Sequence, residues 1–290
     1  MEQPPARLLV SKSHRSLGLP EMLSVEKNVY MARLAEQAER YEEMCAHMKE
    51  VALEMEPLGI DERNLLAVAF KNVTGARRSA LRTIVGIEQR ERELLHAGDR
   101  GAARRLRHAE AYRRRVEAEL DEVSGVVLGL IDSRLVPSNP GLRTQQEQED
   151  AEAQVFYQKM RADYHRYKAE AGSAEEHAAL AEASYRAASK VAQTGLAPTH
   201  PVRLGLALNY AVFLYEVPQH STEACERAKQ AIDDAIAELD CAASLDAASY
   251  RDSTLIMQRL RDNLVLWGRE GGAGARAEGA TLHLARGPLT

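Results

Sequence analysis

Three basic residues at helical spacing are the first feature of this sequence that could carry chemistry. Lys71, Arg78 and Arg82 lie at i, i+7 and i+11, which keeps them within about 40° of one line along a helix at 100° per residue. Such a row is usually a solvated helix face. It becomes a candidate anion site only if a second element brings further cations to the same place.

A second basic set lies in the segment from Lys159 to Tyr167. Lys159, Asp163 and Arg166 share one helical face, and Tyr167 follows one step round the helix. Guanidinium groups form bidentate, charge-assisted hydrogen bonds with a doubly charged phosphate, which a carboxylate with a single charge matches less well. Two helices that carry these faces could therefore clamp one phosphate group.

Motifs for catalysis or for a cofactor are weak in this chain. A di-iron bundle needs two Glu-x-x-His pairs, and the sequence has one, Glu93 to His96, beside a glycine that ends its helix. The segment 272–277 resembles a dinucleotide fingerprint but sits in a glycine-rich tail, without the strand that the fingerprint requires. We therefore expect a protein that is not an enzyme, with no catalytic group, no cofactor and no metal site.

Composition restricts the class of protein further. The 290 residues are 45% hydrophobic and carry 43 acidic against 38 basic side chains, so any basic function must be local. The longest stretch without a charge, 204–215, is well short of the roughly 20 residues that span a bilayer. The N-terminal segment lacks the apolar region of a secretory signal. Three widely spaced cysteines argue against a disulfide framework. We expect a cytoplasmic protein, with the nucleus left open, and no membrane partner.

Apolar residues recur three and four positions apart through most of the chain, which predicts an all-α fold of about nine helices. Helix starts are expected at Ser24, at Asp61 and at a capping box from Ser173 to Glu176. Two long helices are expected over 61–96 and about 100–134. Further breaks are expected at 98–101, 137–141, 195–201, 218 and 242–244. The predicted organisation is a mobile extension over 1–23, one helical domain over 24–268 and a mobile tail over 269–290.

Several segments then carry a family resemblance. Residues 63–72 (RNLLAVAFKN) and 250–267 (YRDSTLIMQRLRDNLVLW) resemble the two signature sequences of the 14-3-3 proteins, and 34–44, 73–79 and 198–209 match as well. The similarity runs from about residue 25 to residue 267. It implies a divergent member with an N-terminal extension and insertions near 94–107 and 138–149. The fold that it implies is a bundle of antiparallel helices that form a concave amphipathic groove, in a homo- or heterodimer.

The same resemblance implies an adaptor that binds phosphorylated client proteins. Lys71, Arg78, Arg166 and Tyr167 match the positions that grip the phosphate of a phosphoserine or phosphothreonine peptide. The other groove positions are matched by Arg82, Lys159, Leu208, Asn209, Val212, Glu216, Arg259, Asn263, Leu266 and Trp267. Cross-subunit contacts of the dimer are matched by Arg40, Glu43, Tyr112 and Arg115.

One departure from the family pattern leaves the ligand preference open. Arg259 stands where the family places a leucine, on one helical face with Asn263 and Leu266. It could favour ligands with an acidic residue near the phosphosite, or it could impair the groove. In the second case the chain would be a structural heterodimer partner that binds no phosphopeptide.

A third hypothesis is an enzyme or nucleic-acid binder hidden in the insertions. The first insertion leads into seven arginines within sixteen residues, but only Tyr112 offers a stacking surface and acidic residues dilute the charge. The seven arginines are Arg100, Arg104, Arg105, Arg107, Arg113, Arg114 and Arg115. Nucleic acid is therefore not the expected partner.

Overall fold

The computed structural model describes residues 19–55, 57–135, 145–171, 174–217, 219–241 and 247–273. Over these ranges the chain forms nine α-helices and no strand, which confirms the predicted all-α fold. None of the described helices is both long enough and apolar enough to cross a membrane. The helices are α1 (Leu19–Gln37), α2 (Tyr41–Glu54), α3 (Ile60–His96), α4 (Ala102–Leu130), α5 (Gln145–Glu170), α6 (Ala174–Gly195), α7 (Pro201–Glu216), α8 (Ser221–Cys241) and α9 (Ala247–Ala273).

Two of the expected helix limits are wrong. The first helix begins at Leu19, so Ser24 is not its N-cap but lies inside it and donates to Glu54 Oε1 at 3.3 Å. The last helix continues past Gly268 to Ala273. Once a helix has formed, adding one more residue to its end costs little free energy. A glycine such as Gly268 is unfavourable in a helix by only about 1 kcal/mol, so it does not always end one. The predictions for 1–18, 137–141, Ser173, 218, 242–244 and 274–290 fall outside the described residues.

The chain divides into two compact units, residues 1–70 and 71–290, which are described separately. In the first unit α1 packs against α2, and Met44, Met48 and Val51 on α2 are fully buried. The turn between these helices has no glycine or proline. Glu39 takes the left-handed conformation there, with φ at 55°, and the Arg40 amide donates to the Ala35 carbonyl at 2.8 Å.

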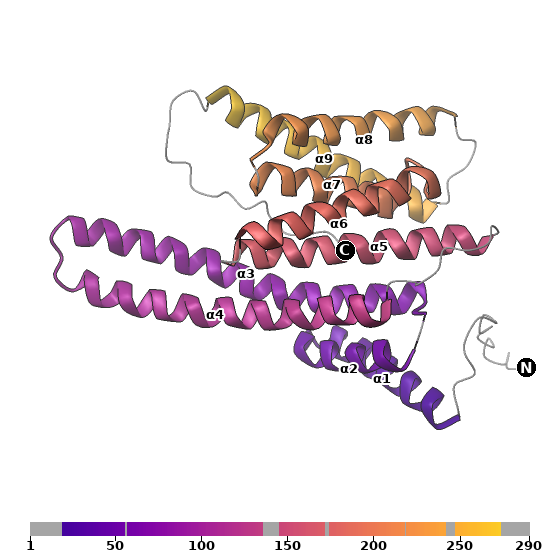
Figure 1. Ribbon diagram of the computed structural model, residues 1–290, viewed down its shortest axis with the longest axis horizontal. Helices are drawn as coiled ribbons and strands as arrows, with labels where there is room; N and C mark the ends of the chain where they lie inside the picture. The colour runs from indigo at the N-terminus through magenta and orange to yellow at the C-terminus, as the bar shows by residue number, and fades with distance from the viewer. Residues whose placement is uncertain are drawn as a thin grey trace, which may run out of the picture. The chain divides into compact units, whose positions relative to one another are not determined.

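In the second unit the part of α3 from Lys71 onward runs antiparallel to α4 (Figure 1). Ion pairs join them at several levels. Glu88 on α3 is 2% exposed and accepts from Arg113 on α4 at 2.8 Å, and Glu91 pairs with Arg105 at 2.9 Å. A five-residue π-helical turn, Ile131–Leu135, follows α4 directly. The predicted helix over about 100–134 is therefore confirmed in length.

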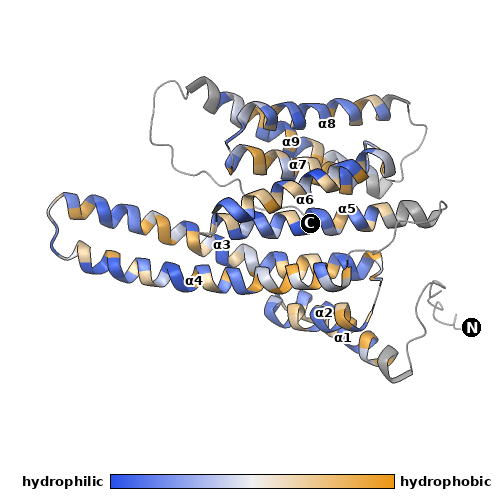
Figure 2. Cartoon of the chain, viewed as in Figure 1, coloured by the Kyte–Doolittle hydropathy of each residue, from blue (hydrophilic) through white to orange (hydrophobic). Residues whose placement is uncertain are grey.

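The other five helices build the main core around α7. Figure 2 shows hydrophobic residues concentrated on α7, whereas α8 is largely hydrophilic. At the centre Tyr185 of α6 stacks on Tyr210 of α7, with 5.0 Å between ring centroids, and Phe213 lies 5.3 Å from Tyr185. Helix α5 packs along α6, and α7 contacts α5, α8 and α9. This core holds α5, α7 and α9 in place, and these helices carry most of the predicted site residues.

Candidate functional site

Two of the predicted phosphate-binding arginines share one carboxylate. Arg78 of α3 donates to Glu170 of α5 through Nε at 2.8 Å and through a terminal nitrogen at 3.1 Å. Arg166, one turn before Glu170 on α5, donates to the same carboxylate at 3.0 Å. Both guanidinium groups are mostly buried. The structure thus brings Arg78 and Arg166 together from helices far apart in the sequence and holds both in fixed positions.

Tyr167 forms a platform under these two guanidinium groups. The guanidinium carbon of Arg78 lies 4.2 Å from the centroid of the Tyr167 ring, and that of Arg166 lies 4.8 Å away. Both distances fit cation–π contacts. Burial, together with the charge of Asp163, raises the pKa of the Tyr167 phenol, which therefore stays neutral near pH 7. Tyr167 is a neutral support with a hydroxyl, not an additional charge.

Lys71 differs from the two arginines because the described residues provide no carboxylate partner for its ammonium group. The side chain is half-buried on α3. Burial, together with the nearby charges of Lys159 and Arg259, lowers the pKa of the Lys71 ammonium to about 8. Cations from α3, α5 and α9 are therefore close enough to one another to interact. A partly desolvated ammonium beside two other cations is stabilised by an anion.

Asp163 is the second fixed point of the cluster. It accepts from the Asn209 amide at 2.8 and 3.0 Å and from the Tyr185 hydroxyl at 2.5 Å, and it pairs with Lys159 at 3.2 Å. Burial is the largest single influence and opposes its charge, but Lys159, Arg166 and the hydrogen bond from Tyr185 together lower the pKa of the carboxyl. Asp163 thereby fixes the side chains of Lys159 and Asn209, both of which were predicted groove residues.

Sequence reasoning missed the roles of Asp163 and Glu170. Each stands four residues after a cation on α5, at the spacing of a helical ion pair. That spacing was visible in the sequence, but it also fits an ordinary solvated pair. What identifies these carboxylates is the contact of Glu170 with Arg78 of α3, across 92 residues of chain.

The remaining predicted groove residues divide into accessible and buried groups. On α9 Arg259 and Leu266 are exposed and Asn263 is half-buried. Leu255, on the same face and 49% exposed, was not predicted. Leu208 and Trp267 are buried, and Trp267 stacks on Tyr215 with 4.6 Å between centroids. Val212 and Glu216 are partly buried, and Glu216 lies 3.9 Å from Arg166.

Arg82 lies at the margin of the cluster. Its side chain is exposed, one turn beyond Arg78 on α3. Partial burial and the charge of Arg78 lower its pKa, whereas Glu170 and Glu216 act in the opposite direction. Arg82 is thus close enough to Arg78 for the two charges to interact.

The predicted dimer residues are exposed in the units that contain them. Arg40 and Glu43 form an ion pair at the start of α2 in the first unit. Tyr112 is 56% exposed on α4 of the second unit, and Arg115, also exposed, pairs with Glu119 at 3.4 Å. These side chains are therefore accessible to a partner chain.

Some of the arginines near the start of α4 form ion pairs. Arg105 binds Glu91 and Asp99, and Arg113 binds Glu88 and Glu117. A nucleic acid would have to displace these carboxylates.

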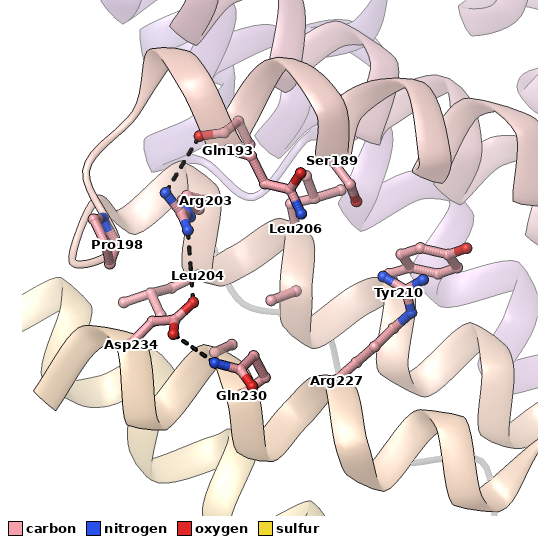
Figure 3. A pocket seen from close by; sticks show the side chains of 13 residues that line it. Ser189, Gln193, Pro198, Arg203, Leu204, Leu206, Tyr210, Arg227, Gln230 and Asp234 are labelled. Carbon is pink, nitrogen blue, oxygen red and sulfur yellow. Dashed lines mark hydrogen bonds and ion pairs between the residues drawn. The ribbon is translucent and has the colours of Figure 1, made fainter. Parts of the chain in front are cut away.

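A cavity of about 130 Å³ lies between α6, α7 and α8 (Figure 3). It contains two arginines, but both have partners. Arg203 donates to the Leu196 carbonyl at 2.8 Å and lies 3.7 Å from Asp234. Arg227 covers the Tyr210 ring at 4.2 Å and pairs with Glu223. None of its lining residues was a predicted site residue.

Comparison with known proteins identifies the family of this chain. The family described as "14-3-3 protein" matches residues 31–268. The 14-3-3-like protein GF14-C of Oryza sativa subsp. japonica is 50% identical over 250 residues, 84% of this chain and 91% of that protein. Protein BMH1 of Saccharomyces cerevisiae is 48% identical over 258 residues, 88% and 90% of the two chains. The 14-3-3 family protein artA of Aspergillus flavus is 49% identical over 245 residues, 83% and 95%. The chain therefore belongs to the 14-3-3 family.

Proposed function

We propose that this protein binds phosphoserine and phosphothreonine peptides of client proteins through Lys71, Arg78, Arg166 and Tyr167. Membership of the 14-3-3 family supports an adaptor or regulatory role, since its members are adaptors rather than enzymes. The observation that carries the finer proposal is the Lys71 ammonium, half-buried beside other cations and without a carboxylate partner among the described residues. A phosphate dianion is the ligand that this arrangement favours.

The geometry also explains how binding could be strong enough to be useful. Glu170 already orients both guanidinium groups, so little side-chain entropy is lost when they bind. Charged hydrogen bonds contribute about 1.5–3 kcal/mol each, less the costs of desolvation and peptide ordering. Together these terms are consistent with low-micromolar affinity for one site. Asn209, held by Asp163, and Asn263 on α9 would bind the backbone of the extended peptide.

Family membership also supports a dimer and the binding of client proteins. A dimer would present two phosphate sites, and a doubly phosphorylated client could gain about 10²–10⁴ in affinity by avidity. We place this activity in the cytoplasm. The alternative, a structural heterodimer partner with an impaired groove, is not favoured by the close similarity to 14-3-3 relatives over most of the chain.

Fluorescence polarisation with a matched pair of peptides tests the proposal. A phosphoserine peptide should bind with low-micromolar affinity, and its unphosphorylated twin should bind at least about 100-fold more weakly. Equal affinity for the two peptides, or no binding of the phosphopeptide, would contradict the proposal.

The affinity for the phosphopeptide is expected to depend on pH, because the charge of Lys71 changes near its pKa of about 8. Below its pKa of about 8 the ammonium is charged, and above it the protein must take up a proton to bind phosphate. The ligand loses its second negative charge below about pH 6. Affinity should therefore be highest between about pH 6 and 8 and weaken by up to about tenfold at pH 9.

The matched control for this pH profile is Lys71→Arg. An arginine stays charged throughout this range, so the affinity of the Lys71→Arg variant for the phosphopeptide should not change between pH 7 and 9. A wild-type profile that is equally flat would rule out the proposed ionisation of Lys71.

A further inference from the structure

The hairpin of α3 and α4 ends in a tip, residues 94–108, that carries a local positive charge. The tip holds four arginines and one acidic residue, a formal charge of +3, in a chain whose net charge is −5. It lies at the far left of Figure 1, away from α5 to α9. The tip is therefore a basic surface separate from the proposed phosphate site. Its charged residues are Asp99, Arg100, Arg104, Arg105 and Arg107.

Three of these arginines are exposed and have no acidic partner among the residues that the structure describes. The fourth, Arg105, faces α3 and pairs with Glu91 at 2.9 Å and with Asp99 at 2.8 Å. Arg104 and Arg107 lie about 100° and 160° round α4 from it, on the side away from α3. Their guanidinium groups are therefore available to an anion from solution. The three exposed arginines are Arg100, Arg104 and Arg107.

Two leucines are exposed at the end of the same tip. Leu94 is 38% exposed and Leu95 is 41% exposed, both in the last turn of α3. The chain reverses just after them, where Gly98 takes the left-handed conformation with φ at 91°. Glu93, directly before the leucines, is exposed and lowers the local charge by one. The tip thus combines exposed apolar side chains with cations that still outnumber the acids.

A membrane surface rich in anionic lipids is the partner that this combination fits. Arginines are attracted to the charged headgroups, and leucines beside them are buried at the boundary with the acyl chains. A nucleic acid would gain little from the leucines, and it favours aromatic side chains for stacking, whereas residues 94–108 contain no Phe, Tyr or Trp. We expected no membrane partner because no segment could span a bilayer, but a contact at the surface needs no spanning helix.

We infer that the tip of the α3–α4 hairpin binds the surface of membranes rich in anionic lipids. Arg100, Arg104 and Arg107 contact the headgroups, and Leu94 and Leu95 insert below them. This contact goes beyond the proposed function and uses none of the residues of the phosphate site. A protein held at a membrane in this way keeps that site for a phosphorylated client.

Co-sedimentation of the protein with lipid vesicles tests this inference. Vesicles of phosphatidylcholine that contain phosphatidylserine should bind the protein, and vesicles of phosphatidylcholine alone should not. Added salt should weaken the binding, because exposed charges are screened. The double substitution Arg104→Gln with Arg107→Gln should lower the binding constant at least about tenfold. Neither side chain has an acidic partner among the described residues, so this variant should keep the wild-type circular dichroism spectrum and phosphopeptide affinity.

Two controls separate the tip from net charge and from the phosphate site. Lys190→Gln with Lys229→Gln removes the same charge from exposed positions on α6 and α8 and should leave vesicle binding unchanged. Lys71→Glu should also leave it unchanged. An equal loss of binding in the lysine variant would overturn the inference. So would binding that Lys71→Glu abolishes and the arginine variant keeps, because the lipid phosphate would then lie at Lys71.

Insertion of the leucines is tested with Leu94→Trp. The new tryptophan should shift its emission to shorter wavelength when anionic vesicles are added, against the constant background of Trp267, which is buried. A basic surface that serves only as a polyanion site would give no such shift. Its absence, or a single-stranded RNA that binds more tightly than the vesicles at the same salt concentration, would also contradict the inference.

Discussion

Replacing Lys71 with glutamate is expected to weaken phosphopeptide binding by at least about 100-fold. The substitution removes a charge-assisted hydrogen bond, worth about 1.5–3 kcal/mol, and places a negative charge beside the phosphate in a partly desolvated site. A loss of about 3 kcal/mol corresponds to more than 100-fold in affinity. Fluorescence polarisation with the phosphoserine peptide measures the effect.

A matched control separates the loss of this site from a general change in charge. Lys190→Glu makes the same substitution at an exposed position on α6, outside the cluster. It should bind the phosphopeptide like wild type. Both variants should keep the helical circular dichroism spectrum and a melting temperature close to that of wild type, since Lys71 has no carboxylate partner to lose among the described residues. Binding by Lys71→Glu within tenfold of wild type would remove Lys71 from the site.

The sequence predicted most of the fold because its helices are long and strongly periodic. The helix expected over 61–96 begins at Ile60 and ends at His96. The break expected over 195–201 lies between α6, which ends at Gly195, and α7, which begins at Pro201. The turn at Glu39 could not be predicted in the same way. It relies on a non-glycine residue in the left-handed conformation, and no glycine or proline marks it.

The sequence predicted the basic residues of the candidate site, but not the carboxylates that pair with them. Helical spacing places Lys71 and Arg78 on one face, and the structure places Arg78 beside Arg166. Spacing within one helix cannot reveal that Glu170 serves arginines from two helices. It also cannot distinguish a buried apolar side chain such as Trp267 from an accessible one such as Leu266, because that depends on which helices cover each face.

Replacing Asp163 with alanine is expected to give a large loss of stability. Asp163 is buried and holds four groups: the Lys159 ammonium, the Arg166 guanidinium at 3.9 Å, the Asn209 amide and the Tyr185 hydroxyl. Breaking a buried network by removing one partner costs about 3–5 kcal/mol, because the other groups stay buried without compensation. For a chain of this size the melting temperature should fall by roughly 6–20 °C in a thermal unfolding experiment.

Asp163→Asn is the matched variant that separates charge from hydrogen bonding. Its amide oxygen can still accept from Tyr185, so the loss should be smaller than for alanine. The pKa of Asp163 is lowered in the folded protein, so its charge stabilises the fold above about pH 4, and this contribution is lost as the pH falls through the folded pKa. The difference in melting temperature between wild type and Asp163→Asn should therefore narrow as the pH falls below about 4. A difference that stays constant with pH would show that packing, and not the charge of Asp163, holds Lys159, Arg166 and Asn209 in place.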